Sequence, residues 1–357
     1  MLVYFVMAMA LWREAALEEV LRVICEGLNW LGAIGGKVAC AGKAAISQAR
    51  SRLGWEVMSQ LAEQVLRPIA LPGSAGCWYG GRRVMAVDGT CFDLADEKLN
   101  AEYFGYPDAS RGEPAFPQMR VLSLVECGTH VVSAAEMGPY SRSEQEMAAL
   151  MLPRKLAGDM LLLADCGFYS FNLWGLAQAN GAALLWRVKS SLKPPVEQRL
   201  ADGSHLSRVY DSKDRRRRNG AQVRVIEYKL SGPGTGGKST YRLISNLFDP
   251  QTAPAAELAA LYHERWEIEN VFGEIKIRLY GYRTILRSKT PDLVRQEMWG
   301  LLMALFAIRQ LMCEAAATIT HLGRTFTFAK HIVKMQHFVC AQSSVIHFSH
   351  QHPPGLS

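Results

Sequence analysis

Apolar and polar positions follow two different spacings along this chain. Residues 14–25 and 43–66 carry apolar side chains every three or four positions, a spacing that predicts amphipathic helices. Between residues 82 and 246 the apolar runs are shorter and several are uninterrupted, which is typical of strands buried on both faces of a sheet. Helical spacing returns after residue 254. The pattern therefore predicts helical ends around a middle region that contains a sheet.

Two of the apolar strands end on an aspartate that is soon followed by glycine. Residues 83–88 read Arg-Val-Met-Ala-Val-Asp, and residues 160–165 read Met-Leu-Leu-Leu-Ala-Asp. We expect each strand to stop at its aspartate, with residues 91–94 returning as a partner of the first. A helix over 171–179 and a strand over 182–188 follow the second aspartate. This order predicts a mixed α/β sheet with helices on its faces.

A hairpin and a helix are expected between these two strands. Residues 120–126 and 130–135 alternate as two strands joined by a short turn. Ser143 and Glu146 have the spacing of a capping box, which begins a helix that we expect Pro153 to end.

Residues 189–246 differ from the rest of the middle region. They contain the short strands 223–228 and 240–245, and the dipeptide Asn219-Gly220, which favours a two-residue hairpin turn. We interpret the segment as a β-rich insertion. Its arginine run, Arg215–Arg218, either binds the backbone of a polyanion or is a solvated hairpin tip, and the two interpretations are about equally supported.

The most informative stretch runs from Leu261 to Lys276. Apolar residues recur there at helical spacing within a sector of roughly 60°, which predicts one continuous helix with one buried stripe: Leu261, Ile268, Phe272, Ile275 and Leu279. A second sector of roughly 60° gathers a phenol, a guanidinium, a carboxylate and an ammonium: Tyr262, Arg265, Glu269 and Lys276. Taken alone, Arg265 and Glu269 would be an ordinary surface ion pair.

Bulk properties narrow the class of protein. At 357 residues, with 49% hydrophobic and 20% charged residues, the chain is globular and long enough for two or three lobes or one elaborated domain. The net charge of +7 favours a polyanionic partner. The eight cysteines form no Cys-x-x-Cys, which argues for reduced thiols. The apolar runs 1–12 and 298–312 are too short or too interrupted to span a membrane, so we expect buried helices in a soluble protein.

Three acidic residues could share one site. Asp88 and Asp165 lie at expected strand ends, where α/β sheets place ligands, although an aspartate before a turn is usually only a turn residue. Two strand ends with an aspartate, together with Glu269 on a later helix, are harder to explain by turn formation alone. Carboxylates from three separate elements suit Mg²⁺ or Mn²⁺, and paired ions of this kind promote phosphodiester cleavage. The cations and phenol of the 261–276 helix would then hold phosphates.

Four further residues lie near these motifs. Arg187 and Lys189 are two positions apart beside the strand 182–188, so alternation places them on one face, near Asp165. We therefore expect both to contact phosphates. His263 is interpreted as a surface residue, and Cys166 as a small packing residue rather than a nucleophile.

The spacing Tyr262-x2-Arg265-x3-Glu269-x6-Lys276 resembles the signature of the bacterial cut-and-paste transposases of the insertion-sequence-four group. The segments 87–90 and 164–170 resemble that group's two aspartate motifs, and the similarity runs from about Met1 to Ala316. The resemblance implies an RNase H-like mixed-sheet catalytic core of α/β class, with an inserted β-rich subdomain and flanking helical N- and C-terminal regions.

For the chemistry, the resemblance implies a DDE transposase with two Mg²⁺ ions, for which Mn²⁺ can substitute. Asp88, Asp165 and Glu269 would be the catalytic residues and metal ligands. The reaction would be nicking at a transposon 3′ end, hairpin formation and resolution, and strand transfer into target DNA. DNA contacts would come from several residues: Tyr262, Arg265, Trp266, Lys276, Arg187 and Lys189.

The implied partners are double-stranded DNA, both inverted-repeat ends and target, and a second copy of the chain in a homodimer on DNA, with no membrane. The implied location is the bacterial cytoplasm, in association with the nucleoid. An apolar helix that starts uncapped at Met1 indicates a truncated N-terminal region. The expected domains are a helical region 1–70, the first part of the core 82–188, the insertion 189–246, the rest of the core with the catalytic helix 247–316, and an atypical, partly disordered tail 317–357.

Two other functions remain open at this stage. A catalytically silent or inhibitory remnant would bind transposon ends without cutting them. A host nuclease with an RNase H fold would cut DNA without transposition.

Overall fold

The computed structural model describes residues 1–32, 41–107, 115–229, 240–274, 276 and 285–321, without the side chains of residues 266, 267 and 317–321. Internal contacts divide the chain into two compact units, residues 1–59 with 296–357, and residues 60–295. The expected tail beyond residue 321 and the glycines at 232–237 lie outside the described residues. The five expected domains stay a prediction.

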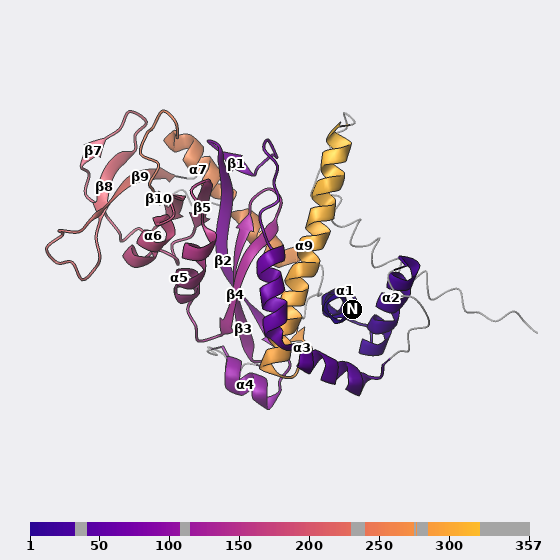
Figure 1. Cartoon of the computed structure of the whole chain (residues 1–357). Helices are drawn as coiled ribbons and strands as arrows, with labels where there is room; N and C mark the ends of the chain where they lie inside the picture. The colour runs from indigo at the N-terminus through magenta and orange to yellow at the C-terminus, as the bar shows by residue number, and fades with distance from the viewer. Residues whose placement is uncertain (33–40, 108–114, 230–239, 275, 277–284, 322–357) are drawn as a thin grey trace, which may run out of the picture. The chain divides into compact units, whose positions relative to one another are not determined.

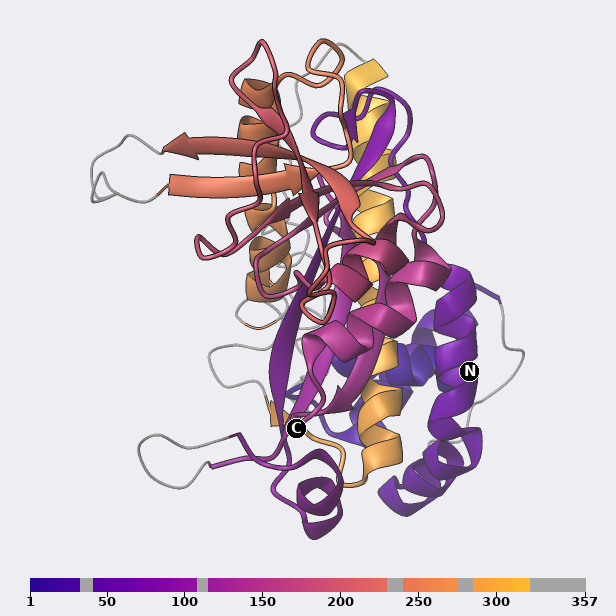
Figure 2. The same ribbon diagram turned by 90° about the vertical axis from the view of Figure 1, so that its left-hand side faces the viewer.

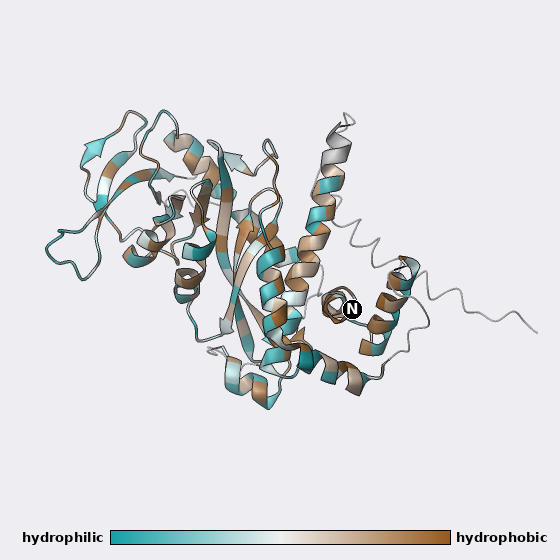
Figure 3. Cartoon of the chain, viewed as in Figure 1, coloured by the Kyte–Doolittle hydropathy of each residue, from teal (hydrophilic) through white to brown (hydrophobic). Residues whose placement is uncertain are grey.

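The first unit is helical where it is described, as the periodicity predicts. Helix α1 is apolar along its length (Figure 3), and Phe5, Val6 and Met9 on it are fully buried or nearly so. Gly300 lets two helices approach closely, because a Cβ at this position would lie 2.7 Å from Val6 Cγ1. The helices are α1 (Leu2–Leu11), α2 (Leu17–Trp30), the start of α3 (Lys43–Val65) and most of α9 (Pro291–His321).

A buried glutamine joins α3 to α9. The Gln296 side chain accepts a hydrogen bond from Arg50 Nε at 2.9 Å and donates to the carbonyls of Arg50 and Gly54, each at 2.9 Å. The Gly54 carbonyl is available because α3 is kinked there, with a positive φ of 73°. The helix expected over 43–66 is therefore present but interrupted by this glycine.

The second unit is built on one mixed sheet of eleven strands (Figures 1 and 2). The central strands β2, β5 and β6 are parallel, whereas β3 and β4 on one side and β10, β9, β8 and β7 on the other are antiparallel. In sheet order the strands are β4 (Val131–Pro139), β3 (Gln118–Glu126), β2 (Arg82–Leu94), β5 (Met160–Ala164), β6 (Ala183–Arg187), β10 (Thr240–Ser245), β9 (Ala221–Lys229), β8 (His205–Val209) and β7 (Gln198–Arg199), with β1 (Trp78–Tyr79) and β11 (Ile285–Leu286) also on β2.

The helices beside the sheet include α4 (Lys98–Phe104), α5 (Glu144–Lys155) and α6 (Phe171–Gln178). Apolar residues of α5 and α6 share one core with sheet residues that include Val87, Leu162 and Trp186. The Trp174 and Trp186 rings meet edge to face at 5.3 Å within this core. The predicted mixed α/β fold is therefore confirmed, and α5 and α6 cover one face of its sheet.

Two local predictions are wrong. Helix α5 begins at the predicted capping box, but it runs through Pro153 to Lys155, because a proline this close to a helix end removes only one late backbone bond. The dipeptide Asn219-Gly220 is not a two-residue turn, since β8 ends at Val209 and β9 begins at Ala221. Instead, the Asp214 carboxylate accepts the N–H groups of residues 218 and 219 and folds a longer loop.

The apolar run 298–312, expected to form a buried helix, lies in α9. Within the described part of the chain, Pro291–Ala316 is the single helical stretch whose length and mean hydropathy would suit a membrane span. The most apolar 18-residue window of this helix is 56% buried inside the protein. A helix that packs in a protein core can be as long and as apolar as a membrane span.

Candidate active site

Asp88 and Asp165 occupy equivalent positions on neighbouring parallel strands. Strands β2 and β5 pair from Arg83 opposite Met160 to Ala86 opposite Leu163, and the same register carried two residues further aligns the two aspartates. Asp165 directly follows the last residue of β5, as predicted. The sheet therefore delivers both carboxylates to one edge.

Asp88, however, does not end its strand. Strand β2 continues through Gly89 to Leu94, and residues 91–93 pair with β3 instead of returning beside residues 83–88. Gly89 is needed for close packing, because a Cβ there would lie 2.4 Å from Glu144 Oε1. The expectation of a turn was wrong because a glycine after an aspartate is equally suited to a close approach.

Each aspartate accepts a local backbone hydrogen bond. Asp88 Oδ1 accepts the Gly89 N–H at 2.8 Å, and Asp165 Oδ1 accepts the Gly167 N–H at 2.7 Å. Burial raises the pKa of Asp88 to about 6, and the nearby charges of Glu144 and Asp165 act in the same direction, against the Gly89 N–H and Arg265. The site concentrates negative charge that a cation would relieve.

The segment expected to be one helix is two. Helix α7 covers Ala255–His263 and α8 covers Trp266–Gly273, and a tight turn separates them. In this turn the N–H of Glu264 bonds to the Leu261 carbonyl at 3.0 Å, three residues back instead of four. Glu264 and Arg265 keep helical backbone angles, so the regular four-residue hydrogen bonding is interrupted without a break in the chain's helical course.

The described members of the predicted stripe, Leu261, Ile268 and Phe272, are still at least 93% buried. The other two, Ile275 and Leu279, lie outside the described residues. The apolar spacing is therefore a reliable guide to burial here even though the helix is broken.

The turn places Arg265 between two of the acids. Its guanidinium lies 3.7 Å from Asp88 Oδ2 through Nη1 and 3.1 Å from Glu269 Oε1 through Nη2. Val87 points into the core with α5 and α6, so Asp88 points to the opposite face, where this arginine meets it. As the side chains stand, no three Asp, Glu, His or Cys groups of the described residues are grouped closely enough to hold a metal ion.

Tyr262 lies beside Arg265, whereas Lys276 lies further along β2, near Phe92 and Asp93. Tyr262 is 4% exposed, its phenol oxygen is buried beside the Arg265 guanidinium, and burial raises its pKa. The Lys276 ammonium lies 5.3 Å from the centre of the Phe92 ring on β2, and burial lowers its pKa. The Trp266 side chain lies outside the described part of the chain.

Of the two basic residues by the strand 182–188, one is placed near the site. Arg187 is close enough to Tyr262 for its charge to affect that phenol, and its guanidinium lies 4.6 Å above the Tyr241 ring. Lys189 is exposed beyond the end of β6. His263 is half-buried against Tyr228 and Tyr241, so it is not the simple surface residue that was expected.

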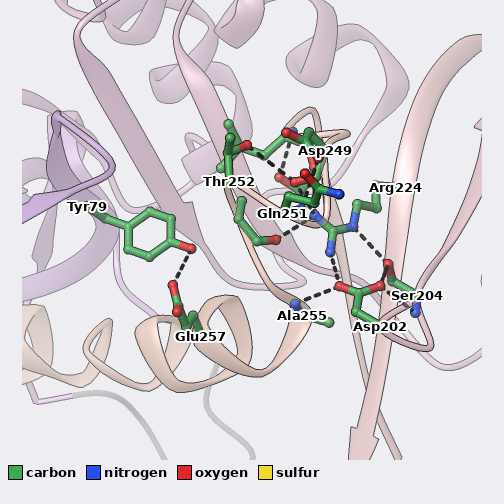
Figure 4. Close-up of polar contacts among 12 residues, drawn as sticks. Tyr79, Asp202, Ser204, Arg224, Asp249, Gln251, Thr252, Ala255 and Glu257 are labelled. Atoms are coloured by element: carbon green, nitrogen blue, oxygen red, sulfur yellow. Dashed lines mark hydrogen bonds and ion pairs between the residues drawn. The ribbon is translucent and has the colours of Figure 1, made fainter. Parts of the chain in front are cut away.

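A network that sequence reasoning missed fixes the start of α7 (Figure 4). Arg224 on β9 is fully buried, pairs with Asp202, and donates to Ser204 Oγ at 2.8 Å and to the Ala253 carbonyl at 2.7 Å. Asp202 in turn accepts the Ala255 N–H at 2.8 Å. A charged residue inside the apolar run of β9 was the available signal.

This network replaces a cap that α7 lacks. The residue before the helix is Pro254, whose side chain cannot accept a hydrogen bond, so the Asp202 carboxylate acts from 53 residues away in sequence. On another side of the first turn, the Tyr79 hydroxyl donates to Glu257 at 3.0 Å. Strand β1 and the insertion together hold the helix that leads to Arg265 and Glu269.

Comparison with known proteins agrees with this geometry. Residues 79–307 match the family model described as "Transposase DDE domain", and residues 1–63 match "Insertion element 4 transposase N-terminal". The chain is 28% identical over 323 residues to "Transposase InsG for insertion sequence element IS4" of Escherichia coli (strain K12), covering 88% of this chain and 70% of that protein. It is also 28% identical over 145 residues to "Putative transposase InsZ" of the same organism, covering 40% of this chain and 48% of that protein.

Among solved structures, the chain is similar to a "piggyBac transposase synaptic complex with hairpin DNA" with a TM-score of 0.48 and 11% identity, over 89% of this chain and 63% of that one. The two family models lie end to end and match most of the sequence, including every residue of the candidate site. The chain belongs to the DDE transposases, in the insertion-element-4 group.

Proposed function

We propose that this chain moves an insertion sequence by cutting and rejoining DNA, with Asp88, Asp165 and Glu269 as its catalytic acids. The observation that carries this proposal is the shared register of the two aspartates, together with the guanidinium of Arg265 that joins Asp88 to Glu269. Family membership supports the reaction class, and the relatives' names describe transposases.

The three acids suit divalent cations in the chemistry of their donors. Carboxylates are the ligands that Mg²⁺ and Mn²⁺ prefer, and the Arg265 guanidinium already marks where positive charge is accepted between two of them. We expect Arg265 to give way when ions bind, since the carboxylates are not gathered around one point with it in place. Bound Mg²⁺ would supply an activated nucleophile and stabilise the leaving oxygen of the phosphodiester.

The neighbouring polar residues would hold the DNA. The buried Tyr262 hydroxyl can donate to a phosphate, while Arg265 and Lys276 can neutralise one. Arg187 and Lys189 would extend this contact along the backbone, and Trp266 would pack against the cut end. These groups bind and orient the strand so that the scissile phosphate meets the acids.

The wider scheme follows from the same proposal. A nick at each transposon 3′ end would be followed by hairpin formation, hairpin resolution and strand transfer into target DNA. Two copies of the chain would act on paired inverted-repeat ends in the bacterial cytoplasm, at the nucleoid. The five segments expected from the sequence would serve as its domains, with the insertion at 189–246 reaching the DNA beside the core.

The test is cleavage of a duplex that carries the element's own end and flanking DNA, with Mg²⁺. Wild type should give a nicked product and then a hairpin. Asp88→Ala, Asp165→Ala and Glu269→Ala should each lose both products, by at least about 10³-fold, and still retard the duplex in a gel.

A variant among these three that kept full cleavage would remove that residue from the set. A wild-type protein that bound ends but never cut them would support a silent remnant. Cleavage without any requirement for the inverted repeat would support a host nuclease.

A further inference from the structure

Helix α5 starts between the two aspartate motifs. Glu144, its first residue, lies over the backbone of Gly89, next to Asp88. The following residue, Gln145, donates its side-chain amide to the Gly167 carbonyl at 2.7 Å, in the turn that Asp165 caps. The first turn of α5 therefore contacts the strand that carries Asp88 and the turn that follows Asp165.

Gly89 is what lets Glu144 come so close. Its missing Cβ would lie 2.4 Å from Glu144 Oε1 and 2.5 Å from Cδ, so any other residue at this position would displace the carboxylate. Only the strand backbone separates Glu144 from the Asp88 position. Across a single strand backbone two carboxylate charges interact appreciably.

An arginine fixes the orientation of this carboxylate. Arg120 on β3 donates from Nη1 to Glu144 Oε1 at 3.0 Å and from Nη2 to the Tyr140 carbonyl at 3.2 Å, and its guanidinium lies 5.1 Å from the centre of the Tyr140 ring. Both members of the pair are largely buried, with side-chain exposures of 20% and 32%. Since Arg120 engages Oε1, the other oxygen of Glu144 keeps its capacity to accept hydrogen bonds.

We propose that Glu144 is a positioning residue of the same site, a fourth carboxylate, held by Arg120 over Gly89, that sets the affinity of the aspartate pair for divalent cations. It adds negative charge on the other side of the β2 backbone from Asp88. This inference rests on the proposed function, because it assumes that the aspartates hold Mg²⁺ or Mn²⁺. Residues outside the direct ligands typically change metal affinity by about 10–100-fold.

The experiment measures Mn²⁺ binding to the full chain without DNA, by the paramagnetic resonance signal of free Mn²⁺. Glu144→Gln should weaken binding by about 10–100-fold. Glu144→Asp, which keeps the charge, should recover most of it. The control is Glu136→Gln on β4, which also removes a carboxylate paired with an arginine, Arg154, and should bind as wild type does.

Cleavage of the end duplex against Mg²⁺ concentration gives a second readout. Glu144→Gln should shift the midpoint to higher Mg²⁺ while the rate at saturating Mg²⁺ stays within about fivefold of wild type. Circular dichroism and thermal melting report whether each variant is folded.

If Glu144→Gln binds Mn²⁺ and responds to Mg²⁺ as wild type does, the inference is overturned, even if the variant melts at a lower temperature. If wild type itself binds no Mn²⁺ and cuts no DNA, the proposed function fails and this inference fails with it. If wild type cuts and Asp88→Ala does not, but Glu144→Gln is unchanged, only the role of Glu144 is lost.

Discussion

Replacing Arg224 by methionine should destabilise the sheet-containing unit strongly. The arginine is fully buried, and its guanidinium satisfies Ser204, the Ala253 carbonyl and the Asp202 carboxylate. Methionine has similar length but no donor, so Asp202 would keep its charge in a site where 18% of its side chain is exposed. Removing one partner of a buried ion pair typically costs about 3–5 kcal/mol.

That cost is a large part of the stability of an ordinary protein, about 5–15 kcal/mol. For a unit of this size each kcal/mol lowers the melting temperature by about 2–4 °C, so a decrease of roughly 6–20 °C is expected. Urea unfolding followed by circular dichroism, with and without the substitution, measures the difference in free energy of unfolding.

The matched control is Arg208→Met on the neighbouring strand β8. Arg208 pairs with Glu197 at 3.3 Å, but their side chains are 49% and 37% exposed, so the loss should stay below about 1 kcal/mol. A double variant, Arg224→Met with Asp202→Leu, should cost less than the sum of its two single variants, because it leaves no buried charge unpaired. Equal, small losses for Arg224→Met and Arg208→Met would refute the reasoning.

Two further outcomes concern the active-site end of the same unit. Asp88→Asn should stabilise the metal-free protein by about 2 kcal/mol at pH 8, because burial raises the pKa of Asp88 to about 6 and ionisation then disfavours the folded state. Because the pKa of Asp88 is raised, its protonated carboxyl contributes fully to the stability of wild type below about pH 4, and this contribution is lost as the pH rises through 6. The melting temperatures of wild type and variant should therefore converge on acidification. Plots of melting temperature against pH that stay parallel would contradict this. Tyr79→Phe, which removes the 3.0 Å hydrogen bond to Glu257, should cost about 1 kcal/mol and lower the melting temperature by about 2–4 °C, and no change at all would mean that solvent already competes for this partly exposed contact.

Sequence patterns located Asp165 correctly because β5 is buried on both faces and its apolar run stops where the strand stops. The same reasoning misplaced Asp88 in the middle of its element. The difference lies in Gly89, whose role depends on Glu144, a residue 55 positions away. A contact of that kind leaves no mark on the local alternation of apolar and polar residues.

The helical spacing of residues 261–276 predicted which apolar side chains are buried, but not the turn at Glu264. The spacing of Tyr262, Arg265, Glu269 and Lys276 is compatible with one helix or with two consecutive helices, so the sequence does not distinguish them. Arg265, the second residue of this turn, lies against Asp88 on a different element. Tertiary ion pairs of this type depend on the packed sheet, so helix propensity alone cannot reveal them.

The insertion is a similar case. Two of its strands, β9 and β10, were predicted, whereas β7 and β8 were not; β10 pairs with β6, so the insertion extends the central sheet. Register across strands distant in sequence is decided by packing. The buried charge of Arg224 has the same origin, since its acceptors come from two loops distant in sequence, the one before β8 and the one between β10 and α7.

Strand β2 has β3 along its length, β5 beside its first half, and β1 and β11 near its two ends. Amide protons in such a strand can exchange with solvent only when several neighbours separate at once, so those around Asp88 should be among the slowest in the chain to exchange. An acid placed there keeps its position through the local opening that frees helix ends and loops. Motion needed to admit DNA would then have to come from the elements that approach β2, while β2 itself stays still.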